Sequence, residues 1–167
     1  MPAGYTTEGW GELFLAEAGA SAALAGLLFV AVSINLDRII ALRNLPGAAL
    51  GAIALLVAVL MVSTFALVPE QPRWALGIEV LVVGLAAWSI LTAIWVRAMR
   101  APIPGQPRFV PVISTVVTQA ATLPLVIAGV SLLLEAGGGL YWLVPGMAFS
   151  LVVAVVNAWV LLVEVVR

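Results

Sequence analysis

Three glutamates are the first candidates for chemistry, because each stands inside or at the end of a long apolar stretch: Glu17, Glu79 and Glu135. An ionisable side chain within a membrane span is costly, so it marks a candidate functional site. Glu79 lies deepest, beyond Arg73 and at about the expected depth of the Ser63 and Thr64 hydroxyls. A carboxyl removed from water suits the handling of a proton or a cation. The alternative is a carboxyl that is hydrated at the interface or paired with Arg73.

A second set of candidates is polar and lies on the fourth long apolar stretch. Thr115, Gln119 and Thr122 follow i, i+4, i+7 spacing, so they share one helix face. Pro124 removes a backbone hydrogen bond at mid-membrane and should kink the helix. Asn157, from the last stretch, falls in the same half of the membrane. These side chains either line a hydrated pathway or bond helices to one another, and bonding between helices is the commoner use.

Several kinds of chemistry are excluded by residue types that the chain does not contain. It has no cysteine, histidine or lysine, so it offers no thiol nucleophile, imidazole ligand or Schiff base. Asp37 is the only aspartate, and no catalytic sequence motif is present. We therefore expect no enzyme, no cofactor and no metal site. The net charge of −1, without a basic surface, also predicts no nucleic-acid partner.

The elements that must position these residues are membrane-spanning helices. Of the 167 residues, 64% are hydrophobic and 9% are charged, whereas a soluble domain carries about 25% charged residues. Each apolar run exceeds the roughly 20 residues needed to cross a bilayer. The sequence predicts an all-α integral membrane bundle, a single domain over 1–167, with five transmembrane helices at about 11–36, 46–68, 74–96, 109–134 and 140–166. The proline-rich segment 100–108 is expected not to be helical.

The arginines predict the orientation of the bundle. Six of them fall on one side of the predicted membrane, namely Arg38, Arg43, Arg97, Arg100, Arg108 and Arg167. Only Arg73 falls on the other side. By the positive-inside rule, the N-terminus is expected outside and the C-terminus in the cytoplasm.

Small residues recur at four-residue spacing on the first two predicted spans. Examples are Gly19-x-x-x-Ala23, Ala22-x-x-x-Gly26 and Gly47-x-x-x-Gly51. Such spacing lets helix backbones approach closely. We expect this packing to lie mainly within the chain, although a neighbouring copy is the alternative.

One stretch of sequence resembles a known group of proteins. It runs from Ala18-Gly19-Ala20 through the segment 26–36 and continues in Asn44-Leu45-Pro46-Gly47. It is similar to small uncharacterised multi-pass membrane proteins of high-GC, actinobacterial-type bacteria, some of which carry an automatic label as modulators of the membrane protease FtsH. The resemblance covers roughly the first two spans and implies a bacterial cytoplasmic (inner) membrane and a protease partner. It carries no site residues.

Two functions follow as hypotheses. The first is a homo-oligomeric channel or transporter for a cation, a proton or a small solute, with its pathway between copies of the chain. The second is a non-catalytic accessory or regulatory subunit of a larger membrane complex, of which a membrane protease modulator would be one form. In both cases the lipid bilayer is the immediate environment of the chain.

Overall fold

The computed structural model describes residues 3–41, 45–100 and 109–166, and the side chains of 4–41, 45–100 and 112–161 among them. It confirms an all-α fold with five helices that are long and apolar enough to cross a membrane. The chain is therefore a multi-pass membrane protein. The long helices are α1 (Gly11–Ile34), α3 (Leu45–Ala66), α4 (Arg73–Arg100), α5 (Phe109–Leu134) and α6 (Leu143–Val166), joined by the shorter η1 (Ala3–Tyr5), α2 (Leu36–Ala41) and η2 (Gly139–Trp142).

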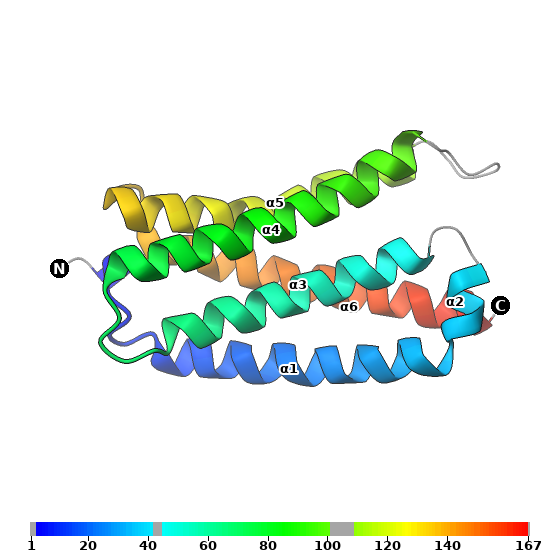
Figure 1. Ribbon diagram of the computed structural model, residues 1–167, viewed down its shortest axis with the longest axis horizontal. Coiled ribbons are helices and arrows are strands. Elements are labelled where there is room, and N and C mark those ends of the chain that lie inside the picture. The colour runs from blue at the N-terminus through cyan, green and yellow to red at the C-terminus, as the bar shows by residue number, and fades with distance from the viewer. Residues whose placement is uncertain (1–2, 42–44, 101–108, 167) are drawn as a thin grey trace.

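The helix ends differ from the prediction where local hydrogen bonding decides them. The first span ends at Ile34 because Asn35 turns the chain, and the Asn35 amide donates to the Ala31 carbonyl at 2.9 Å. α2 then runs across the end of the bundle (Figure 1). α4 continues to Arg100, where basic side chains in the last turn complement the helix dipole. The rest of the segment that we expected to be non-helical, 101–108, lies outside the described residues.

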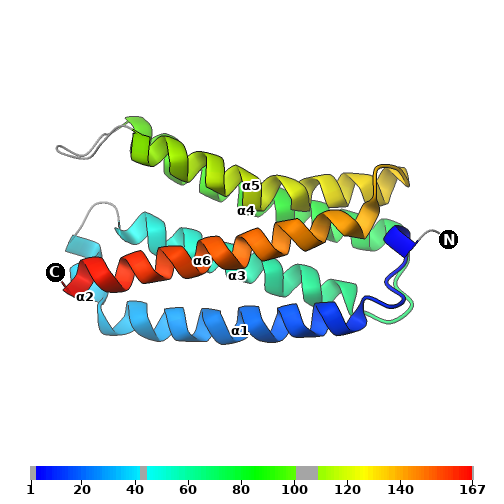
Figure 2. The same ribbon diagram turned by 180° about the vertical axis from the view of Figure 1, so that it is seen from behind.

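The long helices are stacked in three tiers. Figures 1 and 2 both show the α4–α5 pair on one side, α3 and α6 in the middle and α1 on the opposite side. α4 packs most extensively against α5, and α1 packs mainly against α3. The two chain termini lie at opposite ends of the bundle (Figure 1). α1 is therefore a peripheral helix with most of its surface facing outward.

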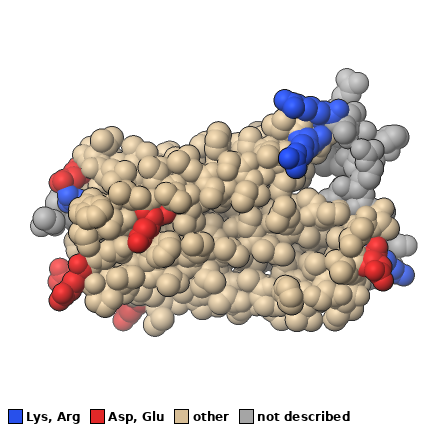
Figure 3. Space-filling model, viewed as in Figure 1, with Lys and Arg blue, Asp and Glu red and all other residues tan. Residues whose placement is uncertain are grey.

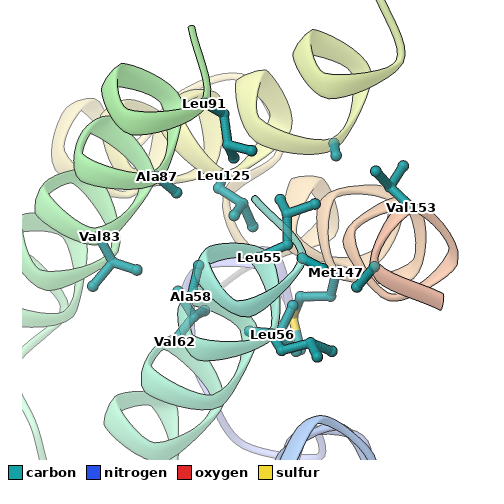
Figure 4. Packing of buried hydrophobic residues seen from close by; sticks show 14 of the residues in the cluster. Leu55, Leu56, Ala58, Val62, Val83, Ala87, Leu91, Leu125, Met147 and Val153 are labelled. Carbon is teal, nitrogen blue, oxygen red and sulfur yellow. The ribbon is translucent and has the colours of Figure 1, made fainter. Parts of the chain in front are cut away.

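The core is formed around α3, the most buried of the five spans. Leu55 and Leu56 of α3 meet Leu125 of α5 and Met147 of α6, and each of these side chains is at most 2% exposed (Figure 4). Lipid tails are as apolar as leucine, so close van der Waals packing rather than escape from water holds such helices together.

Glycines allow α4 and α5 to approach closely. A Cβ on Gly129 of α5 would lie 2.7 Å from the backbone N and Cα of Leu81 in α4. A Cβ on Gly84 of α4 would lie 3.1 Å from the backbone N of Val126 in α5. These two glycines therefore set the distance between the helices.

The prediction that the regularly spaced small residues pack within the chain holds for α3 but not for α1. On α3, Gly47 and Gly51 pack within the chain as expected, because a Cβ at either would lie 3.1 Å from the side chain of Ile94 or Leu91 in α4. On α1 the expectation is wrong. A Cβ at Gly19 or Gly26 would have no atom of the chain within 4 Å. The reason is that α1 contacts α3 through its other face, so its small residues point outward.

The charged side chains separate toward the two ends of the bundle. Figure 3 shows basic atoms grouped at the end where α4 finishes, which carries Arg97 and Arg100, and acidic atoms mostly at the opposite end. Arg38 also lies at the basic end, in α2. The other three arginines expected on that side, at 43, 108 and 167, lie outside the described residues.

Candidate functional site

Two of the three candidate glutamates have partners at the end of the bundle where α4 begins. Glu79 is half-buried in α4, and its Oε2 accepts a hydrogen bond of 2.6 Å from Nε2 of Gln71. Arg73 does not pair with Glu79, because its guanidinium forms an ion pair with Glu135, an exposed residue just beyond α5. The Gln71 amide turns its nitrogen, the hydrogen-bond donor, toward Glu79.

Glu17 is the third candidate and differs from the other two. It lies four residues before Ser21 and eleven before Leu28, so all three share one face of α1. Ser21 and Leu28 are buried, which turns this face toward the bundle. The Glu17 Oε2 atom is itself buried and has no hydrogen-bond partner among the described residues.

Two further oxygens share this property at the same end of the bundle. They are the Ser63 hydroxyl, in the last turn of α3, and the Gln71 side-chain carbonyl, in the connection to α4. Ser63 was expected near Glu79, but its hydroxyl bonds to no described residue. A buried polar atom without a partner costs about 1–3 kcal/mol, so each such atom calls for an explanation.

A cavity of about 310 Å³ opens at this end. Its apolar lining residues are Leu76 of α4, Leu132 of α5 and Leu140 of η2. The polar side chains that line the cavity are Tyr5, Thr6, Thr7, Gln71 and Arg73. The two residues that hold Glu79 and Glu135 therefore face one cavity, whereas Glu17 does not line it.

The N-terminal segment lines the cavity and docks on the connection between α5 and α6. The Tyr5 hydroxyl accepts a hydrogen bond of 2.9 Å from the backbone N–H of Gly138. A Cβ at Gly139 would lie 1.9 Å from the carbonyl oxygen of Gly4, and Gly139 has a positive φ of 58°. Only glycine fits such an approach in this backbone conformation. The Ser131 hydroxyl, in turn, accepts from the backbone N–H of Gly139 at 2.7 Å.

The polar stripe of α5 bonds to α4. The side-chain oxygen of Gln119 accepts from Nε1 of Trp88 at 2.6 Å, and its nitrogen donates to the Thr92 hydroxyl at 3.3 Å. The Trp95 indole donates to the Thr118 hydroxyl at 3.0 Å. Such bonds between helices are the ordinary role of polar residues in membrane bundles.

The other residues of the stripe have different surroundings. Thr122 is fully buried, and its hydroxyl donates to the Thr118 carbonyl of the preceding turn at 2.9 Å. Thr115 and Asn157 are half-buried, on α5 and α6 respectively.

α5 is continuous through Pro124 and changes direction near its middle in Figure 2. Pro124 has no N–H to offer the Ala120 carbonyl. The buried Ser150 hydroxyl of α6 reaches the next carbonyl, that of Ala121, at 3.4 Å. The proline therefore bends the helix where α6 supplies a polar neighbour.

Several residues that line the cavity were not predicted from the sequence. Gln71 and the hydroxyls of Tyr5, Thr6 and Thr7 lie in short connecting segments without helical periodicity. The available signal was Pro72 directly after Gln71, because a proline restricts the backbone conformation of the residue before it.

Comparisons with known proteins give no relative from which a role could be transferred. No family model matches the chain, and neither a curated protein nor a solved structure is similar to it.

Proposed function

We propose that the chain is a small channel or transporter for a cation, a proton or a small solute, working as a homo-oligomer in the bacterial cytoplasmic membrane. The proposed orientation places the end where α4 begins outside the cell and the arginine-rich end in the cytoplasm, in agreement with the positive-inside rule. No enzymatic step is part of this proposal.

The observation that carries the proposal is the buried carboxylate oxygen of Glu17. It lies in the second turn of a membrane-spanning helix, on the face turned toward the bundle, without a hydrogen-bond partner among the described residues. A proton or a cation would satisfy this oxygen. The unpartnered oxygens of Ser63 and Gln71, at the same end, are also suitable ligands for a hard cation.

Flux into liposomes tests the proposal. Purified protein is reconstituted, and proton and potassium fluxes are measured for the natural chain and for Glu17→Gln, which keeps the size of the side chain and removes its charge. We expect the variant to lose most of the flux or to change its ion selectivity. Glu12→Gln is the matched control, because it makes the same change at an exposed position of the same helix.

Two results would count against this function. A liposome that stays tight with the natural, folded chain would remove transport altogether. Unchanged flux and selectivity in Glu17→Gln would remove Glu17 from the pathway.

A second function is favoured by the outward face of α1. Gly19 and Gly26 are open to the membrane, and small residues on a lipid-facing surface let another helix approach closely. This face suits a non-catalytic accessory or regulatory subunit of a larger membrane complex, including a protease modulator, as well as it suits a second copy of the chain.

Native mass separates these assemblies. Gly26→Leu fills the open face without touching the chain's own packing, so it should lower the native mass while the fold remains intact. Gly11→Leu is the control, because that glycine also faces open space but lies at the helix start, before the repeating small residues. Loss of a co-purifying protein in Gly26→Leu, with no change in self-association, would favour the accessory role.

A further inference from the structure

The polar side chains that line the cavity, at the proposed outer end, offer several hydrogen-bond donors. Tyr5 and Thr6 each accept one bond with the hydroxyl oxygen, from Gly138 and Glu8, so their own hydrogens remain to donate. Thr7 adds a third hydroxyl, and Arg73 adds a guanidinium with several N–H groups. The Gln71 amide nitrogen is already bound to Glu79, so Gln71 adds only its carbonyl oxygen, a hydrogen-bond acceptor, to the lining. A group that accepts several hydrogen bonds and carries negative charge fits this lining.

The ion pair of Arg73 does not block such a group. Its partner Glu135 has a side chain that is 60% exposed, and exposed ion pairs contribute about 0–1 kcal/mol. A phosphate oxyanion accepts the same charge-assisted, bidentate hydrogen bonds from a guanidinium as a carboxylate does. A phosphate can therefore compete with Glu135 for Arg73.

The level of the cavity in the membrane and its apolar lining residues indicate which kind of molecule carries the phosphate. Trp74, next to Arg73, is 62% exposed, and Tyr141, next to Leu140, is 56% exposed. Exposed aromatic side chains at the end of a membrane bundle mark the level of the lipid headgroups. Leu76, Leu132 and Leu140 give the cavity a wall that suits glycerol and acyl carbons but gives nothing to a free inorganic ion.

We propose that this cavity is a binding site for the phosphate group of an outer-leaflet phospholipid, held by Arg73 and the hydroxyls of Tyr5, Thr6 and Thr7. A volume of about 310 Å³ lies at the lower end of small-ligand pockets, so it admits the headgroup and the first carbons rather than a whole lipid. The site does not include Glu17, and its assignment to the outer leaflet rests on the proposed orientation of the bundle.

Calorimetric titration of the purified full-length chain in a neutral detergent tests the assignment. Three probes are compared: dihexanoyl phosphatidylglycerol, dihexanoylglycerol without phosphate, and inorganic phosphate. We expect saturable binding of the phospholipid and at least about tenfold weaker binding of the other two. Equal affinity for inorganic phosphate, or for the lipid without phosphate, would overturn the proposal.

Two variants with opposite expected effects identify the residues. Arg73→Gln should weaken phospholipid binding at least about tenfold, because it removes the charged donor. Glu135→Gln should strengthen binding, because it removes the carboxylate that competes for Arg73. Arg97→Gln, an exposed arginine at the other end of the same helix, is the control that should leave affinity unchanged.

A purely structural role of the ion pair predicts a different pattern. Both Arg73→Gln and Glu135→Gln would then lower binding together with thermal stability. Unchanged affinity in Arg73→Gln, with the fold intact, would equally reject the site.

Discussion

Replacing Gly129 by alanine should separate α4 from α5. The new Cβ would lie 2.7 Å from the backbone N and Cα of Leu81, whereas non-bonded carbons prefer about 3.5–4.0 Å. Relief therefore requires the two helices to part by roughly 1 Å, because backbone atoms cannot turn aside. Overpacking of this kind costs about 1–3 kcal/mol. Alanine gains about 0.8–1.0 kcal/mol of helix propensity over glycine, which leaves a net loss of about 0–2 kcal/mol.

Comparing the free energies of unfolding of Gly129→Ala and Gly26→Ala separates the steric cost from the gain in helix propensity. Gly26 also lies in a helix, but a Cβ there would meet nothing within 4 Å. The propensity gain is common to both variants, so the two should differ by about 1–3 kcal/mol in free energy of unfolding. Equilibrium unfolding in mixed micelles, with helix content followed as the denaturing detergent increases, measures this difference. Equal stability of the two variants would refute the close α4–α5 contact on which the reasoning rests.

Two further predictions concern hydrogen bonds that hold the helices and the connection before α6. Gln119→Leu removes the acceptor of the Trp88 indole and should lower the free energy of unfolding by about 0.6–1.7 kcal/mol. Adding Trp88→Phe to it should then cost little more, and fully additive losses would contradict the bond. Ser131→Ala leaves the Gly139 N–H without its acceptor, so we expect a loss of about 1–3 kcal/mol. The Gly139 amide should then exchange with deuterium faster, and an unchanged exchange rate would count against this role of Ser131.

The fold was largely predictable because a bilayer restricts the structures that a chain can adopt within it. Backbone groups in lipid must be satisfied within a helix, so long apolar runs specify both the elements and their number. The helix boundary at Asn35 was less accessible, because it depends on a side-chain bond to Ala31 rather than on hydropathy. The outward face of α1 was mispredicted for a related reason: small residues permit close approach but do not say which partner approaches.

The candidate site was predictable in part. Glu17, Glu79 and Glu135 all lie toward the end of the bundle at which the sequence placed them, but their partners depend on three-dimensional contacts. Glu135 and Arg73 are far apart in the sequence, and Gln71 reaches Glu79 from a loop. Periodicity carries no information on such pairs, because it describes one helix at a time.

The docking of the first residues onto the connection before the last helix has a consequence for how the protein is made. Tyr5 is synthesised before the five long helices described here, and the Gly138 N–H that it binds is synthesised 133 residues later. Intervals of 134 and 133 residues separate Thr6 and Thr7 from Leu140, which lines the same cavity. This cavity therefore does not exist in any nascent chain that lacks the connection between α5 and α6.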